Sequence, residues 1–235
     1  MTILCIETST IVCSAALVVD GEPVASRIDM TGGNHARLLP LFIEELLHDS
    51  LRHHLSIDAI ALSDGPGSYT GLRIGAASAK GLCYGLSCPL VPIHSTEVLC
   101  ASYLVMEQQT PSSAVLCPMI DARRMEVYTA CYDTAIHEIV PISAQIIGSS
   151  TLPLSGSSSH PHFFFGDGAT KCASFLESDY MHFTPGIVPD AAAMGHLAEE
   201  RLATHQIIEG VKLAYYEPFY LKQFVAAQSH VKGLR

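Results

Sequence analysis

Short apolar runs separated by polar turns fill the start of the chain. Residues 3–6, 13–19 and 23–28 are rich in aliphatic and β-branched side chains, and Asp20-Gly21 separates the second run from the third. Runs of this length predict strands, and Asp-Gly is a strong hairpin signal. The pattern therefore predicts a buried strand followed by a β-hairpin.

Longer segments of the same half show helical spacing. Leu38, Leu41, Phe42 and Leu46 lie three or four positions apart, which is typical of an amphipathic helix. Ser95 has the character of an N-cap for a later helix. The other elements expected in this half are strands over 57–62 and 89–93 and helices over 34–51, 73–86 and 95–106.

After Pro111 the same order of elements begins again. Glu7 and Asp121 occupy matching places, each at the end of a first buried strand and just before a hairpin. This layout predicts strands over 115–120, 126–132, 136–139 and 163–165, an irregular stretch over 142–161, and helices over 169–176 and 191–204.

A repeated hairpin-plus-helix layout is typical of the actin-like, RNase H-like (ASKHA) α/β architecture, in which two lobes close on a nucleotide. We therefore predict a duplicated two-lobe α/β fold. The first lobe is expected over residues 1–105, joined by the tail over 206–235, and the second lobe over 106–205.

Composition and charge restrict the classes of function. Of 235 residues, 49% are hydrophobic and only 15% are charged, which is explained equally well by a surface partly covered in an oligomer or complex and by simple drift in composition. The net charge of −10 argues against tight, autonomous binding of nucleic acid, since phosphate neutralisation supplies much of that affinity. The sequence leaves room for a role beside a partner that holds RNA.

The eight cysteines form no Cys-x-x-Cys motif, and several lie in apolar runs. This usage indicates a reducing cytosol rather than a disulfide framework or a zinc site. The N-terminus has no basic segment before its first apolar run, and no apolar stretch reaches the length of a membrane span. We expect a cytoplasmic protein without a signal peptide or a membrane segment.

A glycine-rich segment, Asp-Gly-Pro-Gly-Ser-Tyr-Thr-Gly-Leu-Arg-Ile-Gly, covers residues 64–75 between an expected strand and an expected helix. Such a loop can cradle an anion with its backbone N–H groups. It can equally fix the start of a helix that the chain presents to another protein. Both interpretations stay open on the sequence pattern alone.

Four motifs in order carry a resemblance to a known family. They are Ile-Glu-Thr-Ser at residues 6–9, the glycine-rich segment over 65–75, Asp-Ala-Arg-Arg-Met-Glu-Val-Tyr at 121–128 and Glu-Pro-Phe-Tyr-Leu at 217–221. With these motifs the chain resembles the bacterial TsaB (YeaZ) family over nearly its whole length.

This resemblance implies an actin-like fold and a cytoplasmic role in making threonylcarbamoyladenosine next to the anticodon of tRNA. It implies a non-catalytic dimerisation subunit that binds a TsaD-like paralogue, the transferase, and a TsaE-like ATPase. It also implies a homodimer when the chain is alone, and only indirect contact with tRNA.

The transferase paralogue of the family carries His-x-x-x-His, whose imidazoles share a metal ion on one helix face. Here His94 is present, but Val98 stands where the second histidine would be. We therefore expect no metal site, and His94 is interpreted as a polar residue at the end of a strand.

The strongest alternative function is a nucleotide-binding ATPase or hydrolase. It would act through Glu7, Asp121 and the loop from Gly65 to Gly75, because actin-like ATPases place acids at these hairpin positions. The first turn, Thr-Ser-Thr at residues 8–10, has no glycine to approach phosphates, so we predict no catalytic residue and no cofactor, with ATP binding only weakly or within the complex. Candidate nucleotide contacts are Glu7, Gly65, Gly67, Asp121, Gly166 and Gly168.

The two long helices of the first lobe carry more apolar and small residues than one buried stripe needs. Gly75, Ala79 and Cys83 lie four positions apart and form a face of small side chains. Glycine inside a helix costs about 0.5–1 kcal/mol relative to alanine, so close approach of a partner helix is one explanation, and packing on the chain's own sheet is the other. In the family these helices build the dimer interface. The predicted partner surface consists of Leu38, Leu41, Phe42, Leu46, Arg73, Gly75, Ala79, Leu82 and Cys83.

Overall fold

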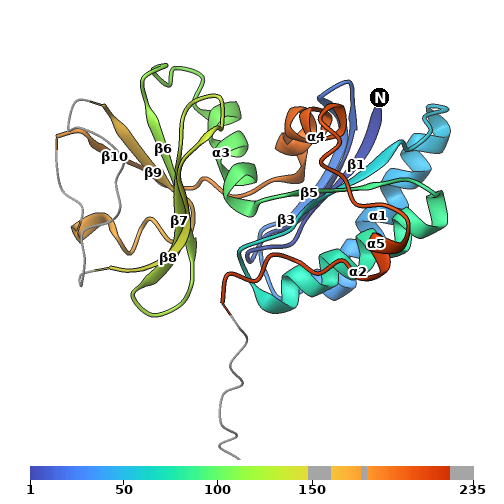
Figure 1. Ribbon diagram of the computed structural model, residues 1–235, viewed down its shortest axis with the longest axis horizontal. Helices are drawn as coiled ribbons and strands as arrows, with labels where there is room; N and C mark the ends of the chain where they lie inside the picture. Colours follow the sequence, from blue (N-terminus) through green and yellow to red (C-terminus); the bar gives the residue numbers. More distant parts are fainter. Residues whose placement is uncertain (148–159, 176–178, 223–235) are drawn as a thin grey trace, which may run out of the picture.

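Two lobes, each built on one five-stranded sheet, lie side by side in the computed structural model, which describes residues 1–147, 160–175 and 179–222 (Figure 1). The strand order is β3-β2-β1-β4-β5 in the first sheet and β10-β9-β6-β7-β8 in the second. Read from β8, the second sheet repeats the order of the first. This repeat confirms the predicted duplicated, actin-like two-lobe α/β fold.

The first sheet follows the predicted strands closely. In it β1 pairs antiparallel with β2 and parallel with β4. The strand β3 extends the antiparallel edge and β5 the parallel edge. Its members are β1 (Thr2–Glu7), β2 (Cys13–Val19), β3 (Glu22–Asp29), β4 (Ala59–Ser63) and β5 (Leu90–Ile93).

The second sheet differs more from the sequence pattern. The strand β8 runs well beyond the predicted 136–139, because it pairs with the whole length of β7 as an edge strand. The short strand β10 was not predicted; it pairs parallel with β9. The members are β6 (Val115–Asp121), β7 (Glu126–Tyr132), β8 (Glu138–Ile146), β9 (His162–Phe165) and β10 (Met181–Thr184). Much of the stretch predicted to be irregular lies outside the described residues.

Helices cover both faces of the first sheet. On one face, α1 (His35–Arg52) and α2 (Tyr69–Leu86) pack over β1, β2 and β4. On the other face lie the 3₁₀ turn η2 (Ala191–Met194) and α4 (Gly195–Ala203) (Figure 1). The segment 191–203, which the sequence order assigned to the second lobe, thus fills the core of the first.

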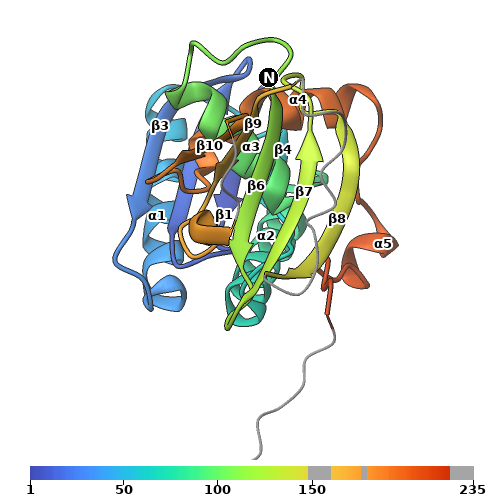
Figure 2. The same cartoon turned by 90° about the vertical axis from the view of Figure 1, so that its left-hand side faces the viewer.

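The helix α3 (Ser95–Met106) lies at the junction of the lobes. Val98 packs in the core of the first lobe, whereas Leu99, Cys100 and Tyr103 pack against β6 and β9 of the second. The helix is buried nearly all round over its first nine residues, which fits a position between two sheets. Turning the molecule by 90° brings β6, β7 and β8 to the front, with α1 and α2 behind (Figure 2).

Capping side chains decide where the helices begin. The helix α2 starts at Tyr69, four residues before the predicted start, because the Ser68 side chain accepts a hydrogen bond from the Gly71 N–H over 3.3 Å. The N-cap of α3 is His94 rather than the predicted Ser95. Glu97 accepts from the His94 N–H over 2.9 Å and completes a capping box. In the described part of the predicted helix over 169–176, the only helical element is a 3₁₀ turn, η1 (Ala173–Phe175).

The end of the described chain returns along the first lobe. The Leu90 N–H donates to the Ile208 carbonyl oxygen over 2.9 Å, and the short helix α5 (Val211–Ala214) follows. Lys222 then forms an ion pair with Glu126 on β7 of the second lobe. The rest of the predicted tail, 223–235, lies outside the described residues. Within the described part, no helix is long and apolar enough to cross a membrane.

Two glycines of α2 provide a matched test of this architecture. A Cβ atom at Gly71 would lie 2.0 Å from the Thr8 carbonyl oxygen, whereas a Cβ atom at Gly81 would meet nothing within 4 Å. We expect Gly71→Ala to lower the free energy of unfolding by about 1–3 kcal/mol, or more, through overpacking. Gly81→Ala should instead raise it by up to about 1 kcal/mol, through helix propensity. Urea unfolding of both variants measures the difference; equal effects would contradict the packing described.

Candidate functional site

The glycine loop between β4 and α2 packs on the turn that follows β1. The Ser68 N–H donates to the Ser9 carbonyl oxygen over 2.6 Å, and the Thr8 hydroxyl donates to the Gly71 carbonyl oxygen over 2.9 Å. A Cβ atom at Gly67 would lie 2.2 Å from the Ser9 carbonyl oxygen. The glycines therefore allow two backbone segments of this chain to approach each other closely.

The other side of the loop is covered by the returning tail. Gly65 has a φ angle of +121°, and a Cβ atom there would lie 2.4 Å from the Phe219 carbonyl oxygen. The Phe219 N–H donates to the Asp64 carbonyl oxygen over 2.8 Å. With protein against it on two sides, the loop fits the second interpretation, in which it fixes the start of α2.

Arg73 supports the same interpretation. Its guanidinium donates to the Tyr69 hydroxyl over 3.2 Å and lies 5.4 Å from the centre of that ring. The Tyr69 ring in turn contacts the ring of Tyr220, with 5.1 Å between their centres. Tyr69, held by Arg73, thus connects the first turn of α2 to the tail.

Glu7, the first acid of the predicted pair, is completely buried. One carboxylate oxygen accepts a hydrogen bond from the Ser9 N–H, and the other has no partner in the described part of the protein. Burial raises the pKa of Glu7 to about 7, although the neighbouring Ser63 and Ser9 act in the opposite direction. The side chain therefore has no direct route to a substrate in solution.

Asp121 is exposed and has partners of its own. It forms an ion pair with Lys171 and accepts a hydrogen bond from the Arg123 N–H over 2.8 Å. Its own N–H donates to Asp167 over 2.9 Å. Among the residues that the structure describes, no hydrogen bond links Asp121 to Glu7, and the two acids have separate partners.

Gly166 and Gly168 serve close packing in the second lobe. A Cβ atom at Gly166 would lie 2.3 Å from the Met119 carbonyl oxygen. One at Gly168 would lie 3.0 Å from the Ile120 carbonyl carbon. The turn after β9 therefore fits against β6 only with small residues. This contact explains both glycines without a nucleotide.

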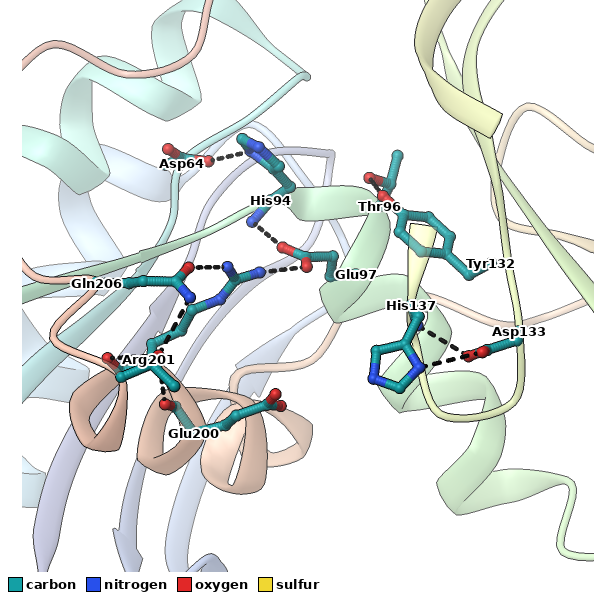
Figure 3. Close-up of polar contacts among 11 residues, drawn as sticks. Asp64, His94, Thr96, Glu97, Tyr132, Asp133, His137, Glu200, Arg201 and Gln206 are labelled. Atoms are coloured by element: carbon teal, nitrogen blue, oxygen red, sulfur yellow. Dashed lines mark hydrogen bonds and ion pairs between the residues drawn. The ribbon is translucent and has the colours of Figure 1, made fainter. Parts of the chain in front are cut away.

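His94 lies in a polar network at the carboxyl ends of β4 and β5 (Figure 3). Its Nδ1 atom lies 3.0 Å from an Asp64 carboxylate oxygen, and its ring contacts the Phe219 ring at 4.9 Å between centres. Burial lowers the pKa of His94, but the hydrogen bond to Asp64 and the charges of Asp64 and Glu97 outweigh it and raise that pKa overall. His94 is thus a polar residue at the end of β5, as interpreted from the sequence.

The network continues from His94 into α4. Glu97, whose carboxylate accepts from the His94 N–H, forms an ion pair with Arg201, and Arg201 donates to Gln206 (Figure 3). Glu97 and Arg201 are 104 residues apart, so no local sequence signal could have paired them.

Val98 is completely buried among apolar side chains. In the described ranges, no group of three His, Cys, Asp or Glu side chains could hold a metal ion.

The predicted partner surface on α1 and α2 needs correction at four positions. Leu46, Gly75, Ala79 and Cys83 are buried in the core of the first lobe. A Cβ atom at Gly75 would lie 2.4 Å from the Thr8 hydroxyl oxygen. The face of small side chains therefore packs on the chain's own sheet, as the alternative explanation held. The predicted residues that reach the surface are Leu38, Leu41, Phe42, Arg73 and Leu82.

The outer side of these helices nevertheless carries a groove. It lies between α1 and α2 and has a volume of about 470 Å³. Nearby, Leu41 is 47% exposed, Leu51 71% and Tyr84 85%. We call this surface the groove face; the residues that line the groove are Pro40, Ile43, Glu44, Leu47, His48, Leu51, Ser78, Gly81 and Leu82.

The groove lies between the two helices that the sequence prediction named, but of the predicted partner residues only Leu82 lines it. On α2 the groove is lined by Ser78, Gly81 and Leu82, whereas Ala79 and Cys83 are buried on another side of the helix. The available signal was Gly81 itself, a glycine inside a helix; a Cβ atom there would meet nothing within 4 Å.

Comparisons with known proteins agree with this architecture. The family model described as TsaD, tRNA N6-adenosine threonylcarbamoyltransferase, matches residues 29–228. The tRNA threonylcarbamoyladenosine biosynthesis protein TsaB of Haemophilus influenzae is 28% identical over 96% of this chain and 95% of its own length. The protein of the same name from Bacillus subtilis is 31% identical over 75% of this chain and 76% of its own length.

A solved structure shows the same similarity in three dimensions. YeaZ from Pseudomonas aeruginosa superposes with a TM-score of 0.77 and 25% identity, over 94% of this chain and 99% of its own length. Matches of this extent cover both lobes of the chain. The chain belongs to the TsaB (YeaZ) family.

Proposed function

We propose that this chain is a non-catalytic dimerisation subunit in the biosynthesis of threonylcarbamoyladenosine next to the anticodon of tRNA. In this proposal its groove face binds a TsaD-like paralogue, and the same face forms a homodimer when the chain is alone. The names of the relatives and the matching family model support the pathway. The groove between α1 and α2 is the observation that carries the interface.

The groove face suits a helical partner. Its walls combine aliphatic side chains such as Leu47 and Leu82 with small residues at Ser78 and Gly81, which lets a partner side chain approach the backbone of α2. Exposed Leu41 and Leu51 extend the apolar surface around it. Burial of these side chains against a partner would contribute about 25 cal/mol for each Å² of apolar surface removed from water.

The interior of the first lobe supports a non-catalytic role. Glu7 is completely buried, and the glycine loop contacts the Thr8–Ser9 backbone on one side and the tail at Phe219 on the other. A catalytic carboxylate must come within hydrogen-bond reach of its substrate. We therefore assign the transfer chemistry, and its metal, to the paralogue.

The remaining partners follow from the same proposal. A TsaE-like ATPase would bind the assembled complex, and ATP would act there rather than on this chain. With a net charge of −10, this subunit would contact tRNA only indirectly. The eight scattered cysteines, which form no Cys-x-x-Cys motif, and the proposed role in tRNA modification fit a cytoplasmic location.

Substitution of Gly81 tests the groove face directly. Gly81→Arg should weaken self-association and binding to the paralogue at least tenfold, because a long charged side chain would fill the groove. The chain itself should stay folded, since a Cβ atom at Gly81 meets nothing within 4 Å. Analytical ultracentrifugation and co-purification with the TsaD-like protein measure the two affinities.

A matched control lies on the opposite side of the same lobe. Ala203 is exposed on α4, which covers the other face of the first sheet, so Ala203→Arg should leave both affinities unchanged. Equal affinities for the wild type and a folded Gly81→Arg variant would overturn the interface assignment.

Glu7→Gln tests the non-catalytic role. Together with the paralogue and the ATPase, this variant should support threonylcarbamoyladenosine formation at the wild-type rate. A folded variant that binds the paralogue but loses activity would favour the alternative, an ATPase or hydrolase acting through Glu7. Glu138→Gln, at an exposed position of β8, controls for the loss of one carboxylate.

The same variant has a predicted pH signature. The pKa of Glu7 is about 7 in the folded protein, against about 4.3 in an unfolded chain, so the folded state holds a proton that the unfolded state releases. The wild type should therefore lose stability relative to Glu7→Gln as the pH rises from about 5 to 8, by up to about 3 kcal/mol. Urea unfolding at each pH measures this difference; parallel profiles would contradict the assigned burial.

A further inference from the structure

The C-terminal end of α2 closes in a cap that brings two cysteines together. Ser87 adopts the left-handed conformation, with φ 55° and ψ 41°. The next N–H, that of Cys88, donates to the Cys83 carbonyl oxygen over 3.1 Å. This is the hydrogen bond of a Schellman motif, in which the side chains of the two bonded residues commonly contact each other.

Both side chains of this cap belong to one apolar cluster. Cys83 is 2% exposed within the core of the first lobe, and Cys88 packs against the same cluster while remaining partly exposed. A disulfide needs its two Cα atoms about 4.4–6.8 Å apart, and the hydrogen bond from the Cys88 N–H to the Cys83 carbonyl oxygen holds the two residues side by side. Their thiols are near enough to form a hydrogen bond with each other.

The two thiols have different chemical character. The hydrogen bond from Cys83 lowers the pKa of Cys88, although burial partly opposes this effect. The same hydrogen bond, together with burial, raises the pKa of Cys83. Because Cys88 is the partly exposed thiol and Cys83 is buried, and because the thiolate is the nucleophile, Cys88 is the thiol that attacks first, and Cys83 is the thiol that resolves the product.

From this arrangement we propose that Cys83 and Cys88 form a reversible disulfide by exchange with a small disulfide such as oxidised glutathione. The Cys88 thiolate attacks one glutathione sulfur, forms a mixed disulfide and releases the first glutathione thiolate. Cys83 then loses its proton, attacks the Cys88 sulfur and releases the second. Two protein thiols are oxidised, and one glutathione disulfide is reduced to two thiols.

A second cysteine pair in this chain provides an internal comparison. The Cys117 and Cys131 sulfur atoms lie 3.8 Å apart on neighbouring strands. Both are almost completely buried, at 1% and 4% exposure, so a glutathione molecule cannot reach either one. Proximity alone does not make a redox site; the Cys83–Cys88 pair also offers access to one thiol.

The disulfide would fix the last turn of α2 without filling the groove. Neither Cys83 nor Cys88 lines the groove, although Leu82 beside them does. A closed loop of this size should raise the Tm by about 5 °C relative to the reduced chain. The inference holds whether or not the groove face binds a paralogue.

The test uses the full chain in glutathione buffers of increasing oxidised fraction. Samples are quenched in acid, unfolded and alkylated, and their peptides are identified by mass spectrometry. We expect one disulfide, between Cys83 and Cys88, and we expect reduced glutathione to reverse it. Cys117 and Cys131 should stay reduced and should therefore be found in alkylated form. The Tm of the oxidised chain should exceed that of the reduced chain.

Single variants separate the two steps. In Cys83→Ala, Cys88 should stop at the mixed disulfide with glutathione. In Cys88→Ser, Cys83 should stay reduced. A stable mixed disulfide on wild-type Cys88, or a chain that stays fully reduced under the most oxidising buffer, would overturn the proposal, as would a preferred Cys117–Cys131 bridge.

Discussion

The close contact between the glycine loop and the β1–β2 turn is the constraint on which the first lobe depends. Gly67 and Gly71 bring the start of α2 so near the carbonyl oxygens of Ser9 and Thr8 that a Cβ atom would not fit. This contact sets the depth at which α2 sits on the sheet. It also places Gly75 against Thr8, so the inner side of α2 is buried in the core.

Because the inner side of α2 is buried in the core of the lobe, only its outer side is available to bind a partner. There, α1 and α2 leave a groove at Gly81 with exposed aliphatic side chains around it. The glycine loop also contacts Phe219 on its other side. These contacts explain the loop's glycines by packing and support the proposed binding role.

The sequence predicted elements well where local signals determine them and less well where long-range packing does. Strands β1 and β2, the hairpin at Asp20-Gly21 and the repeated strand order follow from apolar runs and turn residues. The burial of Gly75 against Thr8 does not follow from the sequence pattern, because helical spacing shows which residues share a face but not what that face contacts. The pairing of Glu97 with Arg201 likewise depends on α4 crossing back to the first sheet.

Hydrogen–deuterium exchange with the TsaD-like paralogue tests the central claim most directly. The chain is measured first at a dilution where it is monomeric, and then in the complex. The account predicts new protection in α1 and α2, over residues 35–52 and 69–86, centred on Gly81. Protection confined to the second lobe or to the β1–β2 turn, with α1 and α2 unchanged, would contradict it.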